Sequence, residues 1–382
     1  MVVSAQVSGT ERRLAFVFRH LNRRFPGRYR LAVSPVAFQI LNRGGFGLDQ
    51  LPGVHVFGRP SRLDHKRRSN APAWVNLGRM VTLGQYRAQM LRWAEREGIE
   101  VLQVYLEMVP FLALFPPRDL PFIVSLVSHL PFYFDGRSLS CRLLLRAVAR
   151  SLKADCLYLP IADGLIGLGA DRRKLNWPSR NTTNHERFHP EPKVAEVTLT
   201  ARAVEFKNPR VVEAVVGRIL ARFPETRFNL LGAGPLQSEL AKVVALNGWK
   251  DRVTVGYVED PSPVVNRSLI HVSLEQFDNS PNQSLLEAMA AGCAVIASDV
   301  GTTRQVVTPD VGLLTSLDPE EVAGKIEELL GNPEKAMALG RAARQAILQE
   351  HHVDTYIDYL GQLHDFSESR PIVGGHRLAP AA

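Results

Sequence analysis

The segment from Val272 to Val300, VSLEQFDNSPNQSLLEAMAAGCAVIASDV, gives the clearest indication of the fold class. An apolar run ends in a polar loop, a helical pattern begins near Ser284 with Glu287 in its first turn, and a second apolar run follows Gly292. Short apolar runs that alternate with helical patterns are typical of a parallel sheet covered by helices. Such sheets bind ligands at the carboxyl ends of their strands, so the candidate functional residues are those of the strand-to-helix loops.

The start of this helix allows two interpretations. Its first N–H groups and its dipole favour a phosphate or an anionic sugar oxygen nearby. A carboxylate in the first turn, here Glu287, can accept two hydrogen bonds from a vicinal diol such as a ribose. The alternative is structural, because Ser284 and Glu287 have the spacing of a capping box. The local pattern by itself favours the capping box.

The same alternation fills the first half of the chain. Four apolar runs predict buried strands, at residues 14–18, 101–106, 122–129 and 156–160. Two helical patterns lie between them, at residues 74–97 and 142–152. The basic segment 59–73 is predicted to be a mobile loop.

After a polar break at residues 181–193 the alternation restarts and predicts a second doubly wound domain. The predicted strands are 197–202, 228–234, 253–257, 269–275, 294–299 and 312–317. The predicted helices are 209–222, 236–247, 284–291 and 319–330, with further helices in 334–365. The predicted class is α/β with two Rossmann-like domains. We place these at 1–185 and 186–345, followed by a helix at 346–366 and a flexible tail at 367–382.

Length and composition agree with this class. A chain of 382 residues fits two domains, and 45% apolar and 22% charged residues are ordinary for a globular protein. The sequence contains no run of 18 apolar residues, the length that a membrane-spanning helix needs, and no secretory signal is visible at the N-terminus. Three widely spaced cysteines favour neither a disulfide framework nor a zinc site, so we expect a cytoplasmic protein without a bound metal.

Positive charge is concentrated at the start of the chain. Residues 1–75 hold 13 Lys and Arg against three acidic residues, a net charge of +10, whereas the whole chain carries +8. A localised positive face suits phosphates, an anionic membrane surface or nucleic acid. A solvated surface that aids solubility explains the charge equally well.

Two further loops carry candidate ligand-binding residues. Arg202 and Lys207 follow a predicted strand, and an arginine and a lysine can converge on a diphosphate, although ordinary surface charges explain the pair about as well. Gly232 and Gly234 end the next strand in a turn that lacks the GxGxxG pattern, which disfavours NAD. The glycines allow a tight turn or the close approach of a flat base.

His129 ends the strand predicted at 122–129, where it is placed to donate to a substrate hydroxyl; a histidine satisfied within the core is the alternative. The sequence contains no GxxxxGK[ST], HExxH or GxSxG motif and no obvious DxD. These absences disfavour P-loop enzymes, zinc hydrolases and lipase-like hydrolases.

Taken in order, these features resemble a retaining glycosyltransferase with the GT-B fold, of glycosyltransferase family 4. The resemblance is continuous from Val197 to Asp365 and includes the Arg-x4-Lys segment, the GxGP turn, VTVGYV and the SPNxSLLEAMAAGxxVIASDVG block. It is patchier in the first half, where VSLVSH, KADCLYLP and NTTNHERFHP match, with Asn184 in place of the usual Asp. The resemblance implies two domains that face each other across a cleft, with C-terminal helices crossing back to the first.

The resemblance also implies roles for single residues. Arg202 and Lys207 would hold the donor diphosphate, Glu287 would bind the ribose, and His129 would lie beside the donor sugar and be needed for turnover. The remaining residues assigned to donor binding on this basis are Asp278, Asn279, Ser280, Asn282, Gly232, Gly234 and Tyr257.

Two features depart from the family pattern. The family commonly shows a second Glu eight residues before the ribose-binding one, where this chain has Asn279. Asp278 stands one position earlier and Glu275 four positions earlier, and we predict Asp278 as the substitute. The Gly-Gly loop expected after the first strand is missing, and Gly44-Gly45 comes late.

The implied reaction is transfer of a sugar from a nucleotide-diphosphate sugar with retention, without a metal or a further cofactor. The basic residues of 12–68 lie on the implied acceptor side. They favour a lipid-linked or anionic acceptor at the inner membrane face and envelope polysaccharide or glycolipid synthesis, though a phosphate-rich soluble acceptor fits as well. Nucleic acid is disfavoured because stacking aromatics do not accompany the basic residues. The alternatives are a sugar-nucleotide epimerase on the same fold and a non-catalytic protein that binds nucleotide sugar or nucleic acid.

Overall fold

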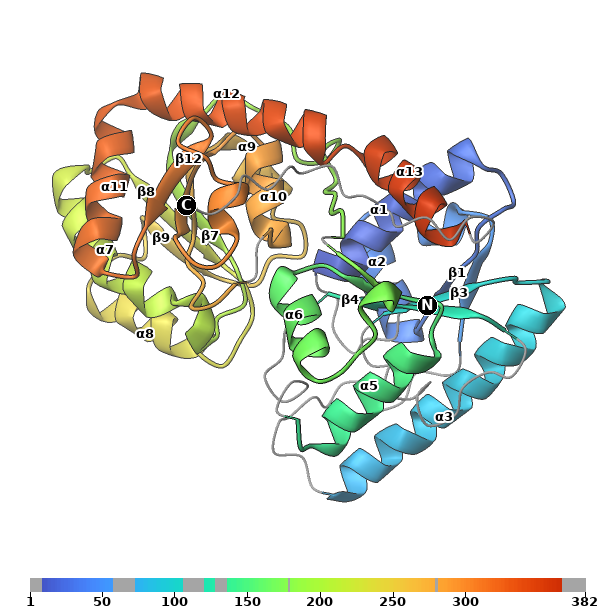
Figure 1. Ribbon diagram of the computed structural model, residues 1–382. Helices are drawn as coiled ribbons and strands as arrows, with labels where there is room; N and C mark the ends of the chain where they lie inside the picture. Colours follow the sequence, from blue (N-terminus) through green and yellow to red (C-terminus); the bar gives the residue numbers. More distant parts are fainter. Residues whose placement is uncertain are drawn as a thin grey trace. The chain divides into compact units, whose positions relative to one another are not determined.

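The computed structural model describes residues 9–57, 73–105, 120–127, 136–177, 179–278 and 281–365. The chain divides into an N-terminal unit, Met1–Asn181 with Tyr356–Ala382, and a C-terminal unit, Thr182–Thr355. Each unit contains parallel strands with helices packed against them (Figure 1). None of the described helices is long and apolar enough to cross a membrane.

The C-terminal unit is built on a six-stranded parallel sheet with the order β12-β11-β10-β7-β8-β9. The chain enters this sheet in the middle, moves outward through β8 to β9, and returns to place β10 on the other side of β7. The order therefore reverses between β7 and β10, and this switch point is where doubly wound sheets bind ligands. The strands are β7 (Val194–Thr200), β8 (Arg227–Leu231), β9 (Val253–Gly256), β10 (Ser268–Ser273), β11 (Ala294–Ser298) and β12 (Gly312–Thr315).

Helices cover both faces of this sheet (Figure 1). One buried cluster packs α7, α8 and α11 against the sheet, and a second packs α9, α10 and α12 against the other face, with α12 contributing to both. The helices are α7 (Pro209–Arg222), α8 (Gln237–Leu246), α9 (Ser262–Arg267), α10 (Gln283–Ala290), α11 (Pro319–Gly331) and α12 (Pro333–Glu350).

The N-terminal unit contains a four-stranded parallel sheet, β3-β4-β5-β6, and a separate parallel pair, β1-β2. Its strands are β1 (Leu31–Val33), β2 (Val54–Val56), β3 (Leu102–Tyr105), β4 (Phe122–Leu126), β5 (Lys153–Cys156) and β6 (Leu175–Asn176). Its helices are α1 (Gly9–Arg24), α2 (Pro35–Arg43), α3 (Ala73–Arg96), α5 (Leu139–Arg150) and α6 (Leu159–Gly167).

The C-terminal helix α13 (Val353–His364) joins the N-terminal unit from Tyr356 onward. Buried polar contacts attach it there. Tyr359 donates its hydroxyl to the carboxylate of Asp155 in β5, which also accepts from Asn176 Nδ2 at 3.0 Å. Burial raises the pKa of the Asp155 carboxyl, while these hydrogen bonds oppose the shift. A carboxylate satisfied in this way fixes the position of the helix.

Most predicted elements are confirmed within a few residues at each end, but two strands are wrong. Residues 14–18 lie within α1. The central turns of this helix are buried on most sides, so its apolar residues are consecutive and lack the 3.6-residue period that indicates a helix in sequence. The strand predicted at 156–160 ends at Cys156, and α6 begins at Leu159 with Pro160 in its first turn. Proline at that position suits a helix start and not a strand. Residues 59–72 and the tail from 366 lie outside the described residues.

His271 in β10 carries a pH dependence that can be measured. It is fully buried, and burial lowers the pKa of its ring from 6.5 to about 3. Between these values the unfolded chain binds a proton that the folded chain does not, so the free energy of unfolding falls as the pH falls. From pH 7 to pH 5 the wild type is expected to lose about 2 kcal/mol more than His271→Gln. Urea unfolding at both pH values measures this, and equal losses would contradict it.

Candidate functional site

The candidate site lies at the carboxyl ends of β7 and β10, where the strand order of the C-terminal sheet reverses. The loop after β7 carries Arg202 and leads into a short 3-10 helix, η4 (Glu205–Lys207). The loop after β10 carries Glu275 and leads to α10. Because β7 and β10 are neighbouring parallel strands, these two loops leave the same edge of the sheet.

At this edge Lys207 and Glu275 form a buried ion pair. Lys207 Nζ donates to Glu275 Oε1, and the two side chains are only 12% and 7% exposed. Asn282 Nδ2 donates to the same oxygen at 3.2 Å. Burial lowers the pKa of Lys207, and the adjacent carboxylate opposes this shift. A buried cation is thus held by a carboxylate that a second donor keeps in place.

The other oxygen of Glu275 has no hydrogen-bond partner within the described part of the chain, although it is buried. A buried carboxylate oxygen without a donor is costly, so one that persists beside a cation is suited to accept from a ligand. The backbone of Glu275 is fixed, because its N–H donates to Ser298 Oγ at 2.8 Å and its carbonyl accepts from the same hydroxyl at 2.9 Å.

Glu275 was not among the residues assigned to the site from the sequence, which selected Asp278 instead. Asp278 accepts from Thr302 Oγ1 at 3.0 and 3.1 Å and so contacts the loop that follows β11. The carboxylate that the structure brings to Lys207 is that of Glu275. The signal that could have found it is its position two residues after the end of β10, on the strand next to the one that leads to Lys207.

Arg202 and Lys207 are brought together by an aromatic ring. The guanidinium carbon of Arg202 lies 5.6 Å from the centroid of the Phe206 ring, and Lys207 Nζ lies 5.7 Å from it. Phe277, from the loop after β10, packs on the same ring with centroids 5.2 Å apart. The Phe206 ring therefore lies beside one exposed and one largely buried cation at the sheet edge.

The capping box predicted for Ser284 and Glu287 is wrong. The N-cap of α10 is Asn282, whose Oδ1 accepts from Leu285 N at 2.9 Å and from Ser284 Oγ at 2.8 Å. Asparagine is among the strongest N-cap residues, and here it begins the helix two positions before Ser284. Glu287 consequently lies in the second turn of α10 and is 6% exposed.

The glycine turn after β8 is required by the backbone of the neighbouring loop. A Cβ added at Gly232 would lie 1.8 Å from the carbonyl oxygen of Ala201, and one at Gly234 would lie 2.3 Å from that of Ala203. Ala203 N donates to Ala233 O at 3.2 Å, so the two loops pair directly. The glycines thus position the segment that carries Arg202.

The other predicted residues fall in two groups. Tyr257 directly follows β9 and is 52% exposed. His129, Asn279 and Ser280 lie outside the described residues. Within the described ranges there is no cluster of three or more His, Cys, Asp or Glu that could hold a metal ion.

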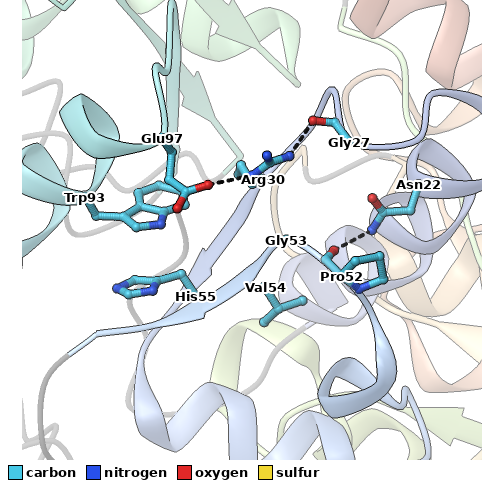
Figure 2. A pocket seen from close by; sticks show the side chains of 9 residues that line it. All are labelled: Asn22, Gly27, Arg30, Pro52, Gly53, Val54, His55, Trp93 and Glu97. Atoms are coloured by element: carbon cyan, nitrogen blue, oxygen red, sulfur yellow. Dashed lines mark hydrogen bonds and ion pairs between the residues drawn. The ribbon is translucent and has the colours of Figure 1, made fainter.

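A separate pocket of about 360 Å³ lies in the N-terminal unit, lined by residues of α1, of the segments around the starts of β1 and β2, and of the end of α3 (Figure 2). Arg30 pairs there with Glu97 at 3.1 Å, and the His55 ring stacks on Trp93 with centroids 5.2 Å apart. Burial lowers the pKa of His55. Arg30 and Gly53 directly precede the two strands, so the pocket lies at their amino ends, and none of the predicted site residues lines it.

The family comparison matches the C-terminal part of the chain. Residues 208–362 match a family described as glycosyl transferase-like. The D-inositol 3-phosphate glycosyltransferase of Segniliparus rotundus is 26% identical over 160 residues, which cover 40% of this chain. The match spans only 36% of that relative's length.

The structural comparisons extend over nearly the whole chain. HepE of Anabaena, solved in complex with UDP-glucose, is similar with a TM-score of 0.70 and 16% identity, covering 95% of this chain and 97% of that one. The sucrose-phosphate synthase of Thermosynechococcus elongatus has a TM-score of 0.64 and 18% identity, covering 88% and 95%. The chain has the fold of the GT-B glycosyltransferases. Its residues 208–362 match the glycosyl transferase-like family, in agreement with the resemblance to glycosyltransferases drawn from the sequence.

Proposed function

We propose that the protein is a glycosyltransferase that moves a sugar from a nucleotide-diphosphate sugar to a saccharide or lipid-linked acceptor. The observation that carries this proposal is the buried Lys207–Glu275 pair beside Arg202, at the switch point of the C-terminal sheet. The fold and the family match of residues 208–362 support the class of activity. Solved structures of the same fold contain UDP-glucose or UDP, which supports a nucleotide sugar as donor.

In this proposal the two cations neutralise the departing diphosphate. Arg202 offers a planar fork for bidentate contacts, and Lys207 offers a compact charge held near it on the Phe206 ring. Negative charge develops on the leaving oxygen in the transition state, where preorganised cations and a helix N-terminus act most strongly. These side chains supply the positive charge that a metal supplies elsewhere, so we propose a reaction that needs no metal and no cofactor beyond the donor.

The carboxylates then orient the donor. Glu287 accepts from the ribose hydroxyls, and the free oxygen of Glu275 accepts from a hydroxyl of the donor. Retention of the anomeric configuration is the outcome proposed from the family resemblance, with the leaving phosphate taking the acceptor proton. The other residues proposed to contact the donor are His129, Asp278, Asn279, Ser280, Asn282, Gly232, Gly234 and Tyr257.

A donor screen tests the proposal directly. UDP, GDP, ADP and their common sugars are titrated calorimetrically and by thermal shift into the wild type, Glu287→Ala and Arg202→Ala. We expect one nucleotide to bind selectively, and each variant to weaken it at least about ten-fold, because each removes a charge-assisted contact of about 1.5–3 kcal/mol. Arg222→Ala, at the far end of α7, is the matched control.

The screen has two informative failures. A folded wild type that binds none of these nucleotides would contradict the proposal. Selective binding without turnover of any acceptor would favour the non-catalytic alternative.

A further inference from the structure

The structure describes eight cations of residues 12–68, and half of them are engaged within the N-terminal unit. Four of these cations contact acceptors from other segments, so part of the positive charge of residues 12–68 is neutralised by a carboxylate or hydrogen-bonded within the protein. The pairs are Arg13 with Asn181, Arg19 with the carbonyl of Phe46 at 2.5 Å, Arg24 with Asp358 at 2.7 Å and Arg30 with Glu97 at 3.1 Å.

Helix α5 of the same unit carries three arginines that have no such partner among the described residues. Arg142, Arg146 and Arg150 are four residues apart on α5, so they lie on one face of the helix, and all three are exposed. The helix contains no acidic residue. Across the described ranges, none of these three arginines forms an ion pair, whereas the opposite face of α5 packs into the core.

The same face begins with an exposed aliphatic side chain. Leu139, three residues before Arg142, is 71% exposed, more than any other large hydrophobic side chain of the described N-terminal unit. Leu152, just beyond the end of the helix, is 38% exposed. Exposed leucines that flank arginines are suited to an interface between water and hydrocarbon, because arginine stems can lie along apolar surface while the guanidinium stays in the polar layer.

The positive surface continues onto a neighbouring segment, the 3-10 helix η3 (Arg172–Lys174). Lys174 Nζ donates to the carbonyl of Ser151 at 2.9 Å, which places η3 against the end of α5. Arg172 and Arg173 are exposed; Arg173 pairs with Asp171 in solvent, where such a pair is worth little. We call the surface formed by Leu139, Arg142, Arg146, Arg150, Arg172 and Arg173 the α5 basic face.

We propose that the α5 basic face docks the protein on an anionic lipid surface, with Leu139 entering the interfacial region and the arginines facing lipid phosphates. Electrostatic attraction to anionic lipid acts over about a Debye length and increases with each cation near the surface. Helix α5 contains no aromatic residue, and the Trp177 ring, whose centroid lies 5.8 Å from the guanidinium carbon of Arg172, packs partly buried against the core. The three arginines of α5 are therefore not accompanied by the stacking aromatics that bind nucleic-acid bases. The biological reason for docking rests on the proposed function, because a lipid-linked acceptor would lie at the membrane surface. The contact with the vesicles is measured independently of that function.

Vesicle co-sedimentation of the full chain tests the proposal. The probes are vesicles of phosphatidylcholine alone and of phosphatidylcholine mixed with phosphatidylglycerol, at low and at physiological salt. We expect binding to the mixed vesicles only, weakened by salt. Replacing Arg142, Arg146 and Arg150 together by glutamine is expected to lower the partition coefficient about 100-fold. Leu139→Ser, which leaves the charge unchanged, is expected to lower it about ten-fold.

A matched variant separates location from total charge. Replacing Arg23, Arg28 and Arg43 by glutamine removes the same three charges from exposed positions elsewhere in the unit, and is expected to retain most of the binding. Glutamine is a good helix former, so α5 remains intact in the test variant. Circular dichroism checks this.

The outcomes distinguish this proposal from the proposed function. Three results would each overturn the docking surface. The first is that the protein does not bind the mixed vesicles, and the second is that both triple variants lose vesicle binding equally. The third is that the α5 variant loses binding to single-stranded RNA while its vesicle binding is unchanged. Nucleotide titration of the α5 variant should match the wild type. Vesicle binding by a wild type that binds no nucleotide would leave the docking surface standing and remove the proposed function.

Discussion

Replacing Lys207 by methionine is expected to lower kcat about 100- to 1,000-fold, the cost of removing one preorganised charge from a developing anion. Lys207 is buried beside Glu275 and shares the Phe206 ring with Arg202, so water cannot simply take its place. The measurement is release of nucleotide from the donor that the screen identifies. A Lys207→Met variant that keeps kcat within ten-fold of the wild type would contradict the role of Lys207.

The same substitution also destabilises the fold, and this must be separated from the loss of activity. Without Lys207, Glu275 is left as a buried carboxylate whose cation is gone, at a cost of about 3–5 kcal/mol. The double variant Lys207→Met/Glu275→Gln removes both charges and is expected to recover most of the stability, but none of the turnover. Recovery of turnover in the double variant would mean that the pair is only structural.

The nearby Arg210 supplies the control for this series. It lies in the first turn of α7, where it pairs in solvent with Glu239 at 2.7 Å and with Glu205 at 3.4 Å. Arg210→Gln removes a positive charge three residues from Lys207, but an ion pair between exposed side chains contributes little to stability. Its kcat is expected to equal that of the wild type.

Gly232→Ala is expected to destabilise the C-terminal unit by more than about 3 kcal/mol, a fall in Tm of roughly 6–12 °C. The added methyl would lie 1.8 Å from the carbonyl oxygen of Ala201. Both groups belong to backbones held by sheet pairing, since Gly232 N donates to Gly256 O at 2.8 Å. No rotamer change can relieve this contact, so the loop that carries Arg202 must shift, and donor binding should fall as well.

Gly324 provides the matched substitution. It lies within α11, and a Cβ added there meets no atom within 4 Å. Gly324→Ala is expected to stabilise the protein by up to about 1 kcal/mol, because alanine is the better helix former. If both variants melted at the temperature of the wild type, the loops after β7 and β8 would not approach as closely as described.

Two errors in the expected elements have local causes. Residues 14–18 were predicted as a strand because a helix buried on most sides shows a continuous apolar run, without the 3.6-residue period that exposes a helix in sequence. The predicted capping box is wrong because Asn282 and Ser284, two residues apart, are both good N-cap residues. Asn282 is the residue that caps the helix, and its side-chain amide also donates to Ser273 and Glu275.

The α/β class, the order of strands and helices in the C-terminal unit, and the loop that carries Arg202 and Lys207 could all be predicted from the sequence. These are encoded locally, because buried parallel strands and half-buried helices each leave a short periodic pattern of apolar residues. The carboxylate that faces Lys207 could not be predicted in this way, because its identity depends on β7 pairing with β10 about 70 residues later in the chain. The requirement for glycine at position 232 and the absence of ion pairs at the three α5 arginines within the described residues also follow only from the tertiary structure, since both depend on backbones and charges brought together from distant segments.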